Sequence, residues 1–311
     1  MRLLYLICLF LWSFAAQALD QDIEVDILAN RVTTLLKAGN HAQALPLFEK
    51  LESMNVKLPE SFDYYYIEAL DKAGNNVKAY ERSEMYLKKY GKKGKYYGQT
   101  IDTLSRLSPQ IEQARIQAIA AVVELAELER QMVQIPYSQS FLIGKTEVTQ
   151  ALWLAVMGNN PSNFAQCDSN CPVEGVSWDD IQLFIKKLNI RTGKSYRLPT
   201  EQEWEYACLA GAQTEYCGSD NLEAVGWYDY NSGGKTHRVS AKQSNAWGLY
   251  DMTGNVWEWT DSCSSSGCAY RVVRGGSISN EILGTRAGAW RSDIASLRRS
   301  DYGFRLARTA P

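Results

Sequence analysis

The pattern of apolar and polar positions changes near residue 130, and in the part before it the pattern is typical of paired helices. Two of its segments, Leu35–Leu45 and Leu70–Tyr80, match at leucine, lysine, alanine, glycine and asparagine when one is moved along the chain by 35 residues. In each copy a Gly-Asn pair marks a turn between two helices, because glycine adopts the left-handed conformation that commonly ends a helix. The pattern therefore predicts two successive helical hairpins.

The spacing of these segments resembles that of tetratricopeptide repeats. We expect helices near residues 23–37, 42–53, 61–73 and 77–90, and a further helix at about 110–130 that is rich in isoleucine, alanine, valine and leucine. Two repeats are too few to bury their faces against neighbours, so the last helix is expected to cap them or to dock onto the next domain. The helical part is either a concave surface that binds a partner or a spacer that positions the rest of the chain.

From Met132 onward the pattern changes to short strands, short helices and turns. Residues 132–136 and 141–144 are predicted to open this part as strands. Helices are expected from Thr149 to Val156, from Ser177 to Arg191 and after Thr200. Ser177 and Thr200 are expected to cap their helices, because serine and threonine are favoured at helix N-termini. Large aromatic side chains hold together folds that are poor in regular structure, so we expect the following tryptophans in the core: Trp153, Trp178, Trp204, Trp257 and Trp259.

Net charge argues against a nucleic-acid-binding protein, and the N-terminal segment indicates an exported one. The 311 residues have a net charge of −2 and are 45% hydrophobic, which is a globular composition without the basic surface that nucleic-acid binding needs. Arg2 precedes an apolar run, Leu3 to Phe14, and Ala16-Gln-Ala18 follows it. These features predict a secretory signal peptide over residues 1–18, with an uncleaved anchor as the alternative. We expect a periplasmic or secreted protein that has no membrane span after cleavage.

Six cysteines remain beyond the predicted signal peptide. An even number of cysteines in an exported chain predicts disulfides. Proximity along the sequence favours the pairs Cys167–Cys171, Cys208–Cys217 and Cys263–Cys268, although six cysteines allow many other pairings. A zinc site fits these spacings poorly, because the histidines of the chain, His41 and His237, are not close to the cysteine pairs in sequence.

Residues 248–260, which read GLYDMTGNVWEWT, fit neither an amphipathic helix nor an alternating strand. They are predicted to form an irregular loop that buried aromatic side chains hold in place and whose carbonyl groups need partners. Two carboxylates, Asp251 and Glu258, and the backbone oxygens of Gly254 and Val256 could bind one hard cation, for which we expect calcium. The alternative is that the two acids only cap and solvate the loop.

Six motifs in the second part resemble the formylglycine-generating-enzyme (sulfatase-modifying-factor) superfamily. GLYDMTGNVWEW, RVVRGGS and GFRLA begin at residues 248, 271 and 303, and the upstream stretches KTEVTQ, PVEGVSW and YRLPTEQEWEYA agree with them. The resemblance covers about 180 residues at the C-terminal end. It implies a C-type-lectin-like fold of irregular mixed architecture for residues 131–311, and with the all-α, tetratricopeptide-like residues 19–130 an α+β protein. Relatives bind an ion at the matching positions of residues 251, 254, 256 and 258, so the resemblance also implies calcium there.

The chemistry of this superfamily needs side chains that the sequence lacks. Formylglycine-generating enzymes use two cysteines shortly after the Gly-Gly-Ser motif, and their thiolates suit copper(I). Here Ile278 to Pro311 contains no cysteine, so we expect no copper and no oxidation of sulfatase cysteines. Relatives that use iron need clustered histidines, and His237 stands alone in this domain. A metal-dependent oxidoreductase with copper or non-haem iron stays open as the alternative to a protein without catalytic residues.

The stretch from Ser277 to Tyr302 is the remaining candidate for function. In the family it forms the substrate pocket, and without the cysteines it would be a binding site. We expect the ligand-binding residues Ser277, Asn280, Trp290 and Arg291, because tryptophan and arginine dominate the energies of interfaces. The alternative is that the arginines here only hold carboxylates and loop carbonyls. The expected function is a calcium-stabilised binding or scaffold module for an unknown protein, glycan or peptide in the cell envelope, unless the helical part carries the function.

Overall fold

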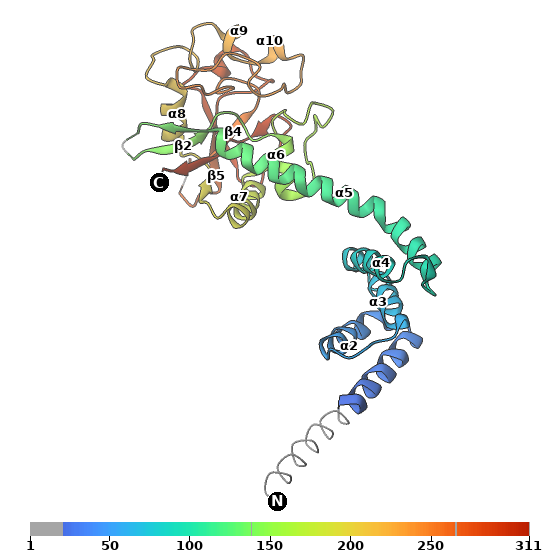
Figure 1. The fold of residues 1–311 in the computed structure, drawn as a ribbon. Coiled ribbons are helices and arrows are strands. Elements are labelled where there is room, and N and C mark those ends of the chain that lie inside the picture. Colours follow the sequence, from blue (N-terminus) through green and yellow to red (C-terminus); the bar gives the residue numbers. More distant parts are fainter. Residues whose placement is uncertain (1–20, 138, 265, 311) are drawn as a thin grey trace, which may run out of the picture. The chain divides into compact units, whose positions relative to one another are not determined.

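The structure, a computed structural model, describes residues 21–137, 139–264 and 266–310. It divides into two units, one up to residue 116 and one from residue 117 onward, so the boundary lies inside the long helix α5 (Tyr97–Arg130) rather than at its end (Figure 1). The predicted signal peptide lies outside the described residues. Among the described helices, none combines the length and the apolar character that crossing a membrane requires.

The first unit is built only from helices, and it forms the predicted hairpins. Residues 21–37 are helical, and α2 (His41–Ser53), α3 (Glu60–Lys72) and α4 (Asn76–Tyr90) follow, each within two residues of its predicted start. A short 3₁₀ turn, η1 (Gly91–Lys93), leads to α5.

The two repeated Gly-Asn turns have the same backbone structure. Gly39 and Gly74 both have φ +76°, in the left-handed region. The N–H of Asn40 donates to the carbonyl of Leu35 at 2.9 Å, and the corresponding bond in the second copy is 2.8 Å long. Both helices therefore end in the same C-terminal capping motif, in which left-handed glycine lets the chain reverse. This shared cap explains why the Gly-Asn pair recurs in both copies.

Helix α5 is longer than the sequence predicted, because it begins at Tyr97 and passes through Pro109. Proline inside a helix removes one hydrogen bond and usually ends or kinks the helix. In the structure Leu107 and Ile111 on either side of Pro109 are buried in the core of the first unit. Burial of these two side chains stabilises the helix across the proline, which is a tertiary effect that the local sequence does not show.

The second unit combines two small sheets with short helices and long connections. One sheet has the strand order β1-β2-β8-β3 and the other β6-β5-β4-β7, and within them only the β4–β7 pair is parallel. The strands are β1 (Met132–Ile135), β2 (Phe141–Gly144), β3 (Tyr196–Arg197), β4 (Trp257–Cys263), β5 (Tyr270–Arg274), β6 (Trp290–Ile294), β7 (Tyr302–Gly303) and β8 (Ala307–Thr309). The helices are α6 (Gln150–Met157), α7 (Trp178–Thr192), α8 (Glu201–Leu209), α9 (Leu222–Val225), α10 (Asp229–Ser232) and the 3₁₀ turn η2 (Ile282–Thr285). With the helical first unit, this confirms the predicted α+β class.

The three predicted helix starts in this unit are confirmed. The hydroxyl of Thr149 accepts a hydrogen bond from the backbone of α6. Ser177 and Thr200 each form a reciprocal cap, in which an acid three residues later accepts a bond from the backbone N–H of the capping residue. Gly193, in the left-handed region, ends α7. These local signals were readable from the sequence because each involves residues only a few positions apart.

Aromatic side chains and disulfides hold the irregular parts of the second unit. Of the tryptophans that we predicted for the core, all but Trp178 are at most 3% exposed, and Trp178 is half-buried. The predicted disulfide pairs are confirmed as Cys167–Cys171, Cys208–Cys217 and Cys263–Cys268. Short-range pairing was the preference that proximity suggested, and each bridge closes a loop of at most nine residues.

Candidate functional site

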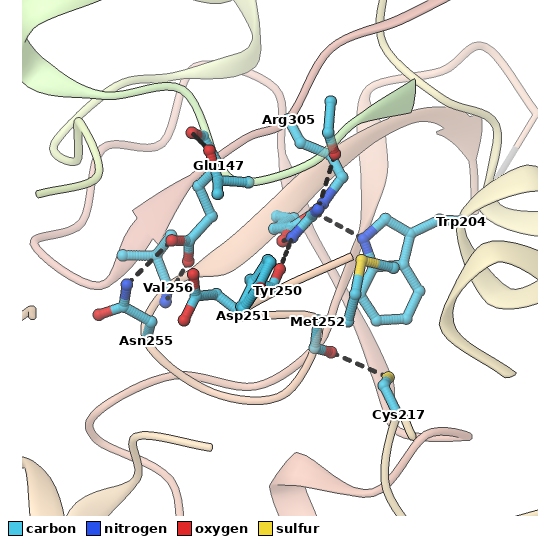
Figure 2. A network of polar contacts seen from close by, with 12 residues as sticks. Glu147, Trp204, Cys217, Tyr250, Asp251, Met252, Asn255, Val256 and Arg305 are labelled. Atoms are coloured by element: carbon cyan, nitrogen blue, oxygen red, sulfur yellow. Dashed lines mark hydrogen bonds and ion pairs between the residues drawn. The ribbon is translucent and has the colours of Figure 1, made fainter. Parts of the chain in front are cut away.

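A buried ion pair lies where the GLYDMTGNVWEW and GFRLA motifs meet. Arg305 donates from Nε and Nη2 to the two carboxylate oxygens of Glu258, each at 2.6 Å, and both side chains are at most 1% exposed. The indole N–H of Trp204 donates to Oε2 of the same carboxylate at 2.6 Å. Arg305 also donates to the carbonyl oxygens of Gly144 and Tyr250 (Figure 2). This arginine therefore ties both sheets and the central loop together.

A second carboxylate, Glu147 of the KTEVTQ motif, reaches the same loop from the other side. Its Oε2 accepts a hydrogen bond from the side-chain amide of Asn255 at 2.9 Å, and its Oε1 accepts one from the backbone N–H of Val256 at 3.3 Å. Figure 2 shows Glu147 and Asp251 turned toward each other. Burial, followed by the negative charges of Asp251 and Glu258, raises the pKa of Glu147 well above its usual value.

Asp251 is the least satisfied acid of this cluster. Its Oδ2 accepts a bond from the backbone N–H of Ser240 at 2.6 Å, whereas its Oδ1 is buried without a hydrogen-bond partner among the described residues. Burial raises the pKa of Asp251 to about 6, against the opposing effects of the Ser240 N–H and Arg305. An unpartnered buried carboxylate oxygen is costly, so a proton or a cation at Oδ1 would stabilise the folded chain.

The four predicted calcium ligands meet different surroundings in the structure. Asp251 has the free oxygen that a cation needs, and Gly254 and Val256 lie in the same loop with their N–H groups bonded to Gly275 and Glu147. Both oxygens of Glu258 contact the guanidinium of Arg305, whose positive charge opposes a cation. Within the described ranges no three acidic, histidine or cysteine side chains lie close enough to hold a metal ion by themselves. Of the two predicted carboxylate ligands, Asp251 thus has an oxygen without a partner, whereas Glu258 is paired with Arg305.

Gly254 shows why this loop needs glycine. It has φ +77°, and an added Cβ would lie 2.0 Å from the carbonyl oxygen of Trp227. The N–H of the following residue, Asn255, donates to that same oxygen at 2.8 Å. Close approach of two backbone segments, rather than a free turn, therefore requires glycine at this position.

The predicted ligand-binding residues do not all face solvent. Ser277 is fully buried, and its hydroxyl donates to Asp301 at 3.0 Å and contacts the side-chain oxygen of Asn280 at 2.9 Å. Trp290 and Arg291 are neighbours on β6, so their side chains point to opposite faces of the strand. Trp290 is 57% exposed, whereas Arg291 bonds Asp293 at 3.0 Å. The structure therefore brings Ser277 and Asn280 together internally and presents Trp290 as the large exposed side chain.

The surroundings of Arg291 form a polar group that sequence reasoning did not single out as a unit. The guanidiniums of Arg291 and Arg299 lie 5.7 and 5.4 Å from the ring centroid of Tyr302. The hydroxyl of Tyr302 donates to Asp293, and Arg299 donates to Asp301 at 2.9 Å. Glu147 was missed in the same way, although an acid inside one of the six motifs that carry the family resemblance is a signal that could have found it.

Comparison with known proteins agrees with this architecture. Residues 115–310 match the family model described as sulfatase-modifying factor enzyme 1-like domain. The chain is similar to the chaperone protein LppX of Paenibacillus barcinonensis, at 31% identity over 193 residues, which cover 44% of this chain and 68% of that protein. It is also similar to the formylglycine-generating enzyme of Mus musculus (34% over 142 residues, 37% of each chain) and to the inactive C-alpha-formylglycine-generating enzyme 2 of Bos taurus (31% over 144 residues, 42% and 45%).

A solved structure shares the fold of the second unit. Treponema denticola variable protein 1 superimposes with a TM-score of 0.53 at 31% identity, over 58% of this chain and 91% of that chain. The chain spans less than half of the mouse and bovine proteins, so the similarity to them concerns part of their length.

Proposed function

We propose, from the premise that the chain belongs to the family of sulfatase-modifying factor enzyme 1-like domains, that it is a non-catalytic member of this family that binds a protein partner in the cell envelope. The observation that carries the proposal is the state of the thiols. All six cysteines between residues 21 and 310 are joined in disulfides, and none follows Gly275-Gly276-Ser277. The copper chemistry of formylglycine-generating enzymes needs free thiolates after that motif, and this chain has no side chain there that can replace them.

The surface around β6 supports a binding role. This strand lies at the end of its sheet, so one side of its backbone has no neighbouring strand in the described sheet. Trp290 and Ile294 are 57% and 45% exposed and, four residues apart, point to the same side of β6. An edge strand that carries an exposed tryptophan can bind a partner through its main chain and anchor it with the indole ring.

Two relatives are consistent with binding rather than catalysis. One is described as a chaperone protein, and the other as an inactive formylglycine-generating enzyme. The predicted signal peptide and the three disulfides support a location in an oxidising compartment. We therefore take the partner to be a protein of the envelope.

Calcium completes the proposal as a structural ion. Asp251, with the backbone oxygens of Gly254 and Val256, would hold it. Its positive charge would neutralise carboxylates that are buried at the centre of the domain. The support for it is the buried, unpartnered Oδ1 of Asp251 and the family resemblance.

Calcium should raise the melting temperature of the wild-type chain and leave that of Asp251→Ala unchanged. A ligand that binds only the folded state stabilises it by about 2.7 kcal/mol at one hundred times its dissociation constant. The measurement is differential scanning fluorimetry in chelator and in increasing calcium, with the exposed Asp179→Asn as the control that should follow the wild type. Melting that is insensitive to calcium in the wild type would remove the ion from the proposal. Stoichiometric copper or iron in protein purified without chelators would contradict the proposal that the chain is non-catalytic.

Replacing Trp290 with alanine should weaken partner capture by about thirtyfold or more, because buried interface tryptophans contribute about 2 kcal/mol or more. Immobilised wild-type chain and variant would be incubated with an envelope extract, and retained proteins would be compared by quantitative mass spectrometry. Ile190→Ala is the control, since Ile190 is 75% exposed and belongs to α7 rather than to β6. A partner retained equally by all three chains would show that the surface around β6 is not the binding site.

A further inference from the structure

Helix α5 carries a stripe of exposed side chains with a regular spacing. Six residues follow one another at intervals of four and three, and all are exposed: Glu112, Ile116, Ile119, Val123, Ala126 and Arg130. The three large apolar side chains among them are 52%, 66% and 59% exposed. Alternating intervals of four and three are the spacing of a coiled-coil seam, where apolar side chains meet a second helix.

The stripe is not the face by which α5 packs against the second unit. Leu125 and Leu128 pack against the core of the second unit, and by the helical period they lie on the opposite side of α5 from Ile119 and Val123. Exposed large apolar side chains arranged in one row are typical of an interaction surface, whereas scattered ones are not. The row therefore needs an occupant.

We propose that this occupant is a second copy of the chain, whose α5 packs antiparallel along the same stripe. In one register each residue of the stripe meets a suitable partner. Ile119 faces Val123 of the other copy, Ile116 faces Ala126, and Glu112 at one end faces Arg130 at the other. In an antiparallel coiled coil each a position of one helix faces a d position of the other, and the twofold symmetry of the dimer repeats every contact.

Opposite charges at the two ends of the stripe select this arrangement. In a parallel pair Glu112 would meet Glu112 and Arg130 would meet Arg130, and both contacts would be repulsive. Arg130 is free to take a new partner, because its bond of 3.3 Å to Glu127 is within the helix and its side chain is 71% exposed. The stripe spans about 28 Å along the helix axis. This length gives a narrow interface, so we expect a weak association that depends on the concentration of the chain.

The first test is sedimentation equilibrium of the full chain over a wide range of concentration. The wild type should dimerise, and Ile119→Glu should weaken the dimer by at least about tenfold, because it places two carboxylates in the apolar seam. Gln117→Glu is the matched control, since residue 117 is also exposed but lies outside the stripe on the same helix. Circular dichroism would show that each variant keeps its helix content. A monomeric wild type, or a dimer that Ile119→Glu does not affect, would overturn the proposal.

A charge exchange tests the antiparallel register itself. Glu112→Arg alone and Arg130→Glu alone should each weaken the dimer, because each sets like charges against one another. The double variant should recover most of the wild-type association, because both ends are then exchanged together. If another protein or another part of the chain covered the stripe, the double variant would not recover. A double variant that stays as weak as the single ones would therefore overturn the antiparallel pairing.

Discussion

Replacing Arg305 with methionine is expected to lower the free energy of unfolding by about 3–5 kcal/mol, because it leaves the carboxylate of Glu258 buried without its counter-ion. Glu258 is at most 1% exposed, and Arg305 supplies two of its three side-chain hydrogen bonds. The carbonyl oxygens of Gly144 and Tyr250 would lose donors as well. Urea denaturation followed by tryptophan fluorescence measures this change.

The double variant Arg305→Met with Glu258→Leu tests whether the loss of stability comes from the unpaired charge of Glu258. Removing both charges avoids an unpaired buried ion, so this chain should be more stable than Arg305→Met alone, by at least about 1 kcal/mol. Arg197→Met is a matched control. Its carboxylate partner, Glu203, is buried, but its own side chain is 33% exposed, so its removal should cost less. Equal losses for Arg305→Met and Arg197→Met would show that burial of the Glu258 pair is not what determines its contribution.

Alanine at Gly254 is expected to destabilise the second unit by more than about 3 kcal/mol. Positive φ costs about 1 kcal/mol for a residue with a Cβ, and the added carbon would also lie 2.0 Å from the carbonyl oxygen of Trp227. Separation of the two backbone segments would break the bond from the N–H of Asn255 to that oxygen. The melting temperature and the yield of folded chain measure the effect.

Gly248 in the same stretch is the matched control for Gly254. Its φ is +75°, against +77° at Gly254, but an added Cβ at Gly248 would meet no atom within 4 Å. Gly248→Ala should therefore show only the conformational cost, about 1 kcal/mol. If both alanine variants lost the same stability, close approach of the backbone would not be the reason for Gly254.

Local signals allowed much of the fold to be predicted. The Gly-Asn turns of the repeats, the caps at Ser177 and Thr200, and the short disulfide loops each depend on residues close in sequence, and the structure confirms them. The start of α5 could not be predicted, because helix formation through Pro109 depends on burial of Leu107 against other helices. The partner of Glu258 could not be predicted either, since nothing near it in sequence indicates a guanidinium 47 residues away.

For this protein the sequence by itself determined the identity of the elements, their caps and the absence of cysteines after Gly276, because these are properties of the chain and of short-range contacts. The tertiary structure alone decided which polar groups meet. It set Arg305 against Glu258 and Glu147 against the Asp251 loop, and it buried Ser277 while leaving Trp290 exposed. The physical reason is that pairing of charges and exposure of side chains depend on distances between segments far apart in sequence, which local pattern does not encode.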